Sequence, residues 1–126
     1  MKLLIDTHLL LWAAADTLPK KAVPFFTNTD NTLFFSSASI WEVAIKHGLN
    51  RPDFSVNPAA LYRGLLDNGY TELPVTANHV LLIAELPLLH KDPFDRILIA
   101  QARAKGLVLL TADETVSQYT PTLYVK

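Results

Sequence analysis

Short apolar runs alternate with longer stretches of mixed polarity along this chain, and the alternation predicts its secondary structure. Short continuous apolar runs are typical of strands buried on both faces. We predict strands at Lys2–Ile5, Thr32–Phe35, Thr71–Val75, Leu107–Leu110 and Leu123–Val125. Helices are predicted at Thr7–Ala15, Lys20–Asn28, Ser36–Leu49, Pro58–Asn68, Thr76–Leu86 and Asp92–Lys105, with a short one opening at Thr111–Glu114. Strands that alternate with helices predict an α/β fold with a central, mainly parallel sheet covered on both faces.

Three features of these predicted helices concern their packing. Pro24 lies inside the predicted helix Lys20–Asn28, where proline is disfavoured because it lacks an N–H and clashes with the preceding turn. The stretch Thr7–Ala15 is apolar on all sides, so we expect a helix covered by the rest of the domain. Trp12 and Trp41 fall within apolar helical patterns, and we expect both in the core.

The bulk composition is that of a single domain spanning residues 1–126. Half of the residues are hydrophobic and the formal net charge is −1, so no basic field indicates a polyanionic partner. The absence of cysteine excludes disulfides and thiolate metal sites. No apolar run approaches the roughly 18 residues of a membrane helix, and the N-terminus lacks a signal-peptide pattern. We therefore expect a cytoplasmic protein without a membrane association, and its apolar excess favours a protein partner.

Four carboxylates follow strands or open helices in this pattern. Asp6 comes directly after the first predicted strand, and Asp113 comes shortly after Leu107–Leu110. Glu42 and Asp95 lie near the starts of two predicted helices. Because sites in parallel sheets form beyond the carboxyl ends of the strands, we expect all four at one edge of the sheet. Clustered acids repel one another, and a hard divalent cation such as Mg²⁺ or Mn²⁺ relieves that repulsion.

Each acid also has a structural interpretation. Asp6 is a good N-cap for the helix that follows it, and Asp113 has the same role open to it. Glu42 forms the sequence pattern of a capping box with Ser39, although Ser36 is an equally good cap. Asp92 is expected to cap the helix that begins at Pro93, which leaves Asp95 in the first turn, where a negative charge suits the helix dipole. The metal-site hypothesis therefore depends on the joint placement of the four acids.

Several other polar residues are weaker candidates for the same site. The hydroxyls of Thr7, Ser36 and Thr111 are placed to hold a ligand carboxylate or a water. Arg96 adjoins Asp95, and we expect it to orient a carboxylate or to meet a phosphate. The four histidines show no shared metal-ligand spacing, and we expect surface or core positions for them: His8, His47, His79 and His90.

Four motifs, in order along nearly the whole chain, resemble those of the PIN-domain nucleases, and in particular the VapC-type toxins of prokaryotic toxin–antitoxin pairs. The motifs are Leu4-Ile5-Asp6-Thr7-His8, Ser36-Ser37-Ala38-Ser39-Ile40-Trp41-Glu42-Val43-Ala44-Ile45-Lys46, Asp92-Pro93-Phe94-Asp95-Arg96-Ile97-Leu98-Ile99-Ala100-Gln101-Ala102 and Leu110-Thr111-Ala112-Asp113. The second and third motifs are specific, whereas the first and last are weak by themselves.

The resemblance implies a three-layer α/β/α fold with an acidic pocket that binds Mg²⁺ or Mn²⁺. It further implies endoribonuclease activity, inhibition by a cognate antitoxin protein, and a homodimer. Carried over position by position, the family's acidic set falls on Asp6, Glu42, Asp95 and Asp113. It leaves open whether Asp92 or Asp95 binds the metal directly.

These implications give one leading hypothesis and two alternatives. The leading hypothesis is an endoribonuclease toxin in which carboxylate-held Mg²⁺ or Mn²⁺ activates water against an RNA phosphodiester. We expect the amphipathic stretches Ser36–Leu49 and Pro58–Asn68 to line a groove for an antitoxin segment. The main alternative is a catalytically inactive PIN-like module that binds RNA or protein. A receiver-like phosphotransfer domain is disfavoured because no aspartate follows the strand Thr32–Phe35.

Overall fold

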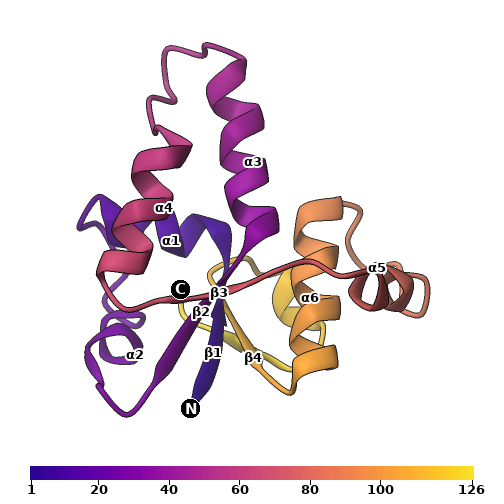
Figure 1. Cartoon of the computed structure of the whole chain (residues 1–126). Coiled ribbons are helices and arrows are strands. Elements are labelled where there is room, and N and C mark those ends of the chain that lie inside the picture. The colour runs from indigo at the N-terminus through magenta and orange to yellow at the C-terminus, as the bar shows by residue number, and fades with distance from the viewer.

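A computed structural model describes all residues from 1 to 126 and places a five-stranded sheet at the centre of the molecule (Figure 1). The strand order is β3-β2-β1-β4-β5, and every neighbouring pair is parallel. The predicted α/β fold with a central parallel sheet is therefore confirmed. The strands are β1 (Lys2–Ile5), β2 (Thr32–Ser36), β3 (Thr71–Leu73), β4 (Val108–Thr111) and β5 (Thr122–Tyr124).

Helices cover both faces of the sheet, which gives three layers. They are α1 (Thr7–Ala14), α2 (Val23–Thr27), α3 (Ser37–Gly48), α4 (Pro58–Asp67), α5 (Ala77–Ile83), α6 (Pro93–Lys105) and a short 3₁₀ helix, η1 (Val116–Gln118). Successive residues of β1 point to opposite faces, as a strand requires. Leu3 and Ile5 join the core formed with α1, α3 and α4, whereas Leu4 joins the core formed with α6 and η1. The alternation divides the core between the two faces.

The centre of the sheet brings two strand ends together. In the pairing of β1 with β4, Leu3 lies opposite Val108 and Ile5 lies opposite Leu110. Strand β1 has β2 on its other side, so the strand order reverses direction between β1 and β4. Open α/β sheets bind ligands at such a reversal, outside the carboxyl ends of the strands.

Some predicted boundaries differ from the observed ones, and proline accounts for two of the differences. The helix predicted at Lys20–Asn28 is only Val23–Thr27, so that Pro24 falls in the first turn, where its missing N–H is tolerated. The strand predicted at Thr71–Val75 ends at Leu73, just before Pro74. The predicted helix Thr76–Leu86 ends at Ile83, and the short helix after Thr111 is a single 3₁₀ turn.

The two expectations about covered apolar residues are wrong in part. Trp41 is 62% exposed rather than in the core, because it lines an apolar pocket at the surface and meets Phe94 edge to face. Helix α3 projects together with α4 beyond the strand ends (Figure 1). In α1 only Thr7, Leu9 and Leu10 are buried, while Trp12 is half-buried and packs against the core. No helix in the structure has both the length and the apolar character needed to cross a membrane.

Candidate metal centre

Asp6 lies at the end of β1 and also begins α1. Asp6 is 2% exposed and is the N-cap of α1. Its Oδ1 accepts a 3.4 Å hydrogen bond from the His8 N–H. Its Oδ2 accepts a 2.6 Å hydrogen bond from the Thr111 hydroxyl, which lies at the end of β4. Asp6 can therefore both cap α1 and take part in a metal site, because one carboxylate oxygen caps the helix and the other faces the end of β4.

Asp113 follows β4 and is tied to the same threonine. Its N–H donates to Thr111 Oγ1 at 3.0 Å, so a single hydroxyl links the backbone of Asp113 to the carboxylate of Asp6. Its Oδ1 accepts from the N–H groups of Thr115 and Val116 at 2.8 and 3.1 Å, which caps the turn leading into η1. The other oxygen, Oδ2, remains available to the site.

The two acids at the N-terminus of α6 have different roles. Asp92 is the N-cap, and its Oδ1 accepts from the N–H groups of Phe94 and Asp95 at 2.8 and 3.2 Å. Asp95 stands in the first turn, and its side chain is 16% exposed. The capping interpretation of Asp92 is confirmed, and the carboxylate of Asp95 is left without a backbone partner.

Glu42 reaches the site from α3. Ser36 caps this helix by accepting from the Ala38 N–H at 3.0 Å, so Glu42 lies in the second turn and the alternative capping box with Ser39 is not formed. The Ser39 hydroxyl instead shares a buried 2.7 Å hydrogen bond with Thr7. Glu42 is 7% exposed and pairs with Lys46 at 3.2 Å.

The electrostatics show that the acids from separate elements share one site. The pKa of Asp95 is raised to about 8, first by burial and then by the negative charges of Asp6, Asp92, Glu42 and Asp113. Burial also raises the pKa of Asp6, although the hydrogen bond from Thr111 opposes this shift. The structure therefore brings the other three predicted acids, together with the capping Asp92, within electrostatic reach of Asp95.

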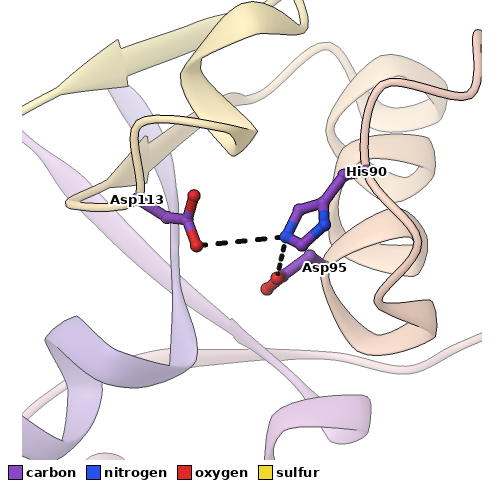
Figure 2. A group of neighbouring side chains, drawn as sticks. All are labelled: His90, Asp95 and Asp113. Atoms are coloured by element: carbon purple, nitrogen blue, oxygen red, sulfur yellow. Dashed lines mark ion pairs between the residues drawn. The ribbon is translucent and has the colours of Figure 1, made fainter.

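The sequence interpretation missed His90. Its Nε2 lies 2.8 Å from Asp95 Oδ2 and 3.9 Å from Asp113 Oδ2, as Figure 2 shows. This nitrogen is buried, and apart from its ion pairs with these two carboxylates it makes no hydrogen bond. One signal was present in the sequence, since His90 directly precedes the segment that opens the acidic helix α6.

The contacts of Arg96 differ from the expected contact with a carboxylate. Its guanidinium donates to the carbonyl oxygens of Pro87 and His90 at 3.2 Å and of Ile83 at 3.1 Å, and to the Tyr119 hydroxyl at 3.3 Å. No carboxylate is among its partners. The guanidinium therefore braces the segment between α5 and α6, which carries His90, and reaches the acids only through that segment.

The donor set fits a divalent cation. Donor atoms of His90, Asp95 and Asp113 lie within 4.8 Å of one another, and the buried His90 nitrogen makes no hydrogen bond beyond its ion pairs with the two carboxylates. Carboxylate oxygens suit Mg²⁺ and Mn²⁺, and a nearby positive charge would stabilise the ionised form of Asp95.

A shallow pocket of about 240 Å³ opens from these strand ends to the surface. It is lined by Asp6, His8, Trp12, Ala112, Asp113 and Lys126. The rings of His8 and Trp12 are 6.1 Å apart and tilted by 44°. Acidic, aromatic and cationic groups are therefore combined in one accessible depression.

Comparison with known proteins identifies the family. The sequence model of the PIN domain matches residues 3–120. This chain belongs to the PIN domain family. Among curated proteins, no sequence matches this PIN domain significantly.

Solved structures share the PIN fold of this chain at low sequence identity. VapBC2 from Rickettsia felis, bound to a DNA fragment from its promoter, gives a TM-score of 0.70 at 16% identity, covering 98% of this chain and 97% of that chain. DNA-bound VapBC from Salmonella typhimurium gives 0.69 at 16% identity, covering 100% and 97%. VapBC-1 from nontypeable Haemophilus influenzae gives 0.66 at 16% identity, covering 98% of both chains. These similarities establish the three-layer fold.

Proposed function

We propose that this PIN domain is a metal-dependent endoribonuclease of the VapC toxin type. The observation that carries the proposal is the convergence of Asp6, Glu42, Asp95 and Asp113 from four separate elements, with the pKa of Asp95 raised to about 8. Desolvated acids that repel one another are costly to a fold, and a bound cation offsets that cost. The intact acid set argues against the inactive binding module.

The chain's own residues have distinct parts in this proposal. Asp6, Asp95 and Asp113 hold a divalent ion, and Glu42 completes the acidic wall. Thr111 fixes the Asp6 carboxylate at 2.6 Å and so sets its orientation at the mouth of the pocket. When bound, Mg²⁺ or Mn²⁺ makes water a stronger nucleophile at neutral pH and offsets negative charge on the scissile phosphate.

RNA is the proposed substrate because the pocket offers contacts to both parts of a single strand. Trp12 and His8 present rings on which an unpaired base can stack. Lys126 supplies a positive charge beside the acids, where a phosphate must approach. The preference for RNA over DNA rests on the resemblance to VapC-type toxins.

The proposed antitoxin partner has a candidate surface beside the metal centre. An apolar pocket of about 330 Å³ lies between α3, α5 and α6 and includes Trp41 and Phe94, whose rings meet edge to face at 5.1 Å. Trp41 adjoins Glu42 and Phe94 adjoins Asp95 in the sequence, so an apolar partner segment here would sit against two elements of the site. Such a segment would block access to the acids.

This surface differs from the groove expected between Ser36–Leu49 and Pro58–Asn68. Helix α4 directs Leu61 and Leu65 into the core, and it borders a separate apolar pocket of about 410 Å³ on the side of α1. Helices α3 and α4 therefore line two different depressions. Of these two pockets, we propose the one that includes Trp41 as the antitoxin site. Two of its lining residues, Trp41 and Phe94, are adjacent in sequence to Glu42 and Asp95.

We also propose that two copies of the chain associate. Leu81 on α5 and Leu88 in the following loop are 70% and 74% exposed, which is unusual for leucines of a small domain. Light scattering of the purified chain should give twice the monomer mass, and Leu81→Gln should return it to the monomer mass. A monomeric wild-type chain at micromolar concentration would remove this part of the proposal.

The experiment that tests the proposed activity is RNA cleavage by the purified chain, freed of any bound partner. A panel of structured and unstructured RNAs is incubated with Mg²⁺, with Mn²⁺, or with EDTA. We expect cleavage with either ion and none with EDTA. Tight divalent-ion binding without cleavage of any RNA would favour the binding module, and cleavage in EDTA would exclude the metal mechanism.

A further inference from the structure

His90 Nε2 is a buried nitrogen in the acidic site that makes no hydrogen bond and whose neighbours are two carboxylates. It faces the space between two carboxylates, at 2.8 Å from Asp95 Oδ2 and 3.9 Å from Asp113 Oδ2 (Figure 2). The 2.8 Å contact pairs the imidazole with the Asp95 carboxylate, and the nitrogen makes no hydrogen bond to any other group. It therefore lies where an ion shared with the two carboxylates would meet it.

The spacing of these donors is that of ligands around a common ion. In an octahedral site with bonds of about 2.0–2.1 Å, adjacent donor atoms lie about 2.9 Å apart and opposite ones about 4.2 Å apart. The two distances from His90 Nε2 fall close to these values, and all three donor atoms lie within 4.8 Å of one another.

We propose that His90 is a nitrogen ligand of the divalent ion, together with Asp95 and Asp113, and that it biases the centre toward first-row transition ions over Mg²⁺. This inference rests on the proposed metal-dependent function. Mg²⁺ takes oxygen donors almost exclusively, whereas imidazole nitrogen binds first-row transition ions with an affinity that rises from Mn²⁺ to Co²⁺. A mixed nitrogen and oxygen set therefore discriminates between the two classes of ion.

The surrounding loop holds His90 in position for this role. Its N–H donates to the Tyr119 hydroxyl at 2.9 Å, and its carbonyl oxygen accepts from Arg96 at 3.2 Å. With both backbone groups anchored, little conformational freedom is lost when the ring binds an ion. The 3.5 Å contact from the Asp92 N–H to His90 Nδ1 is at the outer limit of a hydrogen bond, and it leaves Nε2 as the nitrogen that faces the carboxylates.

The test is electron spin-echo envelope modulation on the full chain loaded with Mn²⁺, which detects nitrogen bound to the ion. We compare the wild type with His90→Gln and with His8→Gln, since His8 is the imidazole that lines the pocket beside Asp6 and Asp113. Nitrogen modulation is expected in the wild type and in His8→Gln, and its loss is expected in His90→Gln. Labelling the histidines of the wild type with ¹⁵N should change the modulation pattern, which keeps the test valid if His90→Gln does not fold.

Calorimetry of Co²⁺ and Mg²⁺ binding gives the second readout. We expect His90→Gln to lower the ratio of Co²⁺ to Mg²⁺ affinity by at least about tenfold, the scale on which shells around a metal affect affinity. Modulation that is absent from the loaded wild type, or that persists in His90→Gln, would overturn the inference. If the chain cleaves RNA with metal but shows no metal-bound nitrogen, only the role of His90 is refuted. If the chain binds no divalent ion, the proposed function is refuted as well.

Discussion

At the scale of single residues, the hydroxyl of Thr111 organises the candidate centre. It donates to Asp6 at the end of β1 and accepts from the backbone of Asp113 just past β4. These two acids are more than a hundred positions apart in the sequence, and one buried side chain of 0% exposure holds them in register. The carboxylate of Asp95 faces them without a backbone partner, and its protonation is the most direct reporter of the site.

The raised pKa of Asp95 predicts how the metal-free protein responds to pH. Its folded pKa is about 8, whereas an unfolded aspartate titrates near ~3.9. Between these values the folded chain binds a proton that the unfolded chain does not, so this group's contribution is complete below pH ~4 and is lost as pH rises through 8. We expect melting in EDTA to occur at lower temperature at pH 8 than at pH 5.5. The slope is at most about 1.4 kcal/mol per pH unit for one proton.

Two comparisons check this prediction. Asp95→Asn should reduce the dependence of the melting temperature on pH, because the group that takes up the proton is gone. Addition of Mn²⁺ at pH 8 should raise the melting temperature of the wild type more than at pH 5.5, since metal and proton compete for the same carboxylate. A melting temperature in EDTA that is equal at both pH values would contradict the account.

At the scale of elements, the segment between α5 and α6 is held by side chains rather than by regular structure. The Tyr119 hydroxyl, on a residue that is 2% exposed, accepts from the N–H groups of Leu89 and His90 at 2.9 Å and donates to the Pro87 carbonyl at 2.6 Å. Arg96 adds bonds to the same segment. The position of His90 therefore depends on two residues that do not belong to the acidic set.

Tyr119→Phe should destabilise this segment and the fold. It leaves the N–H group of His90 without a partner, whereas the Leu89 N–H keeps its 3.0 Å bond to the Pro87 carbonyl. An unsatisfied buried group costs about 1–3 kcal/mol. Chemical denaturation should show a loss of this order. Tyr124→Phe is the matched control, because Tyr124 is 45% exposed and its hydroxyl makes no hydrogen bond, so its stability should be unchanged. Equal stability of the two variants would refute the role given to Tyr119.

The elements differ in how well their sequence predicted them. Strand β1 and the Asp92 cap of α6 were predicted at their observed positions, because apolar runs and capping residues act through local physics. The acids were predicted together because parallel strands share one carboxyl edge. His90 and Arg96 were misjudged because their roles depend on how a loop folds back onto α6 and Tyr119, and no local pattern encodes that contact. Trp41 was misjudged because helical periodicity does not reveal which apolar residues line a pocket at the surface.

At the scale of the whole molecule, the acids lie at the carboxyl ends of the strands, and the apolar pocket of Trp41 and Phe94, here called the apolar flank, lies beside them. The α3–α4 pair projects beyond the strand ends in Figure 1, and α6 packs on the opposite face of the sheet from α4. Trp41 and Phe94 connect α3 and α6 at the border of the centre. One partner can therefore contact the apolar flank and cover the acids together.

Trp41→Gln should weaken binding of the proposed antitoxin while metal binding is unchanged. Trp41 lines the apolar pocket, and loss of a buried aromatic anchor at an interface typically costs at least about 2 kcal/mol, or some 30-fold in affinity. Affinity is measured by calorimetry with the co-purifying partner. Val23→Gln is the control, because Val23 is an exposed apolar residue on α2, away from this pocket. Equal affinities for the two variants would place the partner elsewhere.

The most direct test of the central claim is cleavage of a susceptible RNA in Mn²⁺ by the wild type, by Asp6→Asn and by Asp53→Asn. Asparagine at position 6 keeps one oxygen to accept from the His8 N–H at the helix cap, and its amide N–H can donate to the Thr111 hydroxyl, so the fold should survive. The side chain of Asp53 is 76% exposed, so Asp53→Asn makes the same chemical change away from the centre. The account predicts that Asp6→Asn abolishes cleavage and that Asp53→Asn cleaves like the wild type. Near-normal cleavage by a folded Asp6→Asn protein would contradict it.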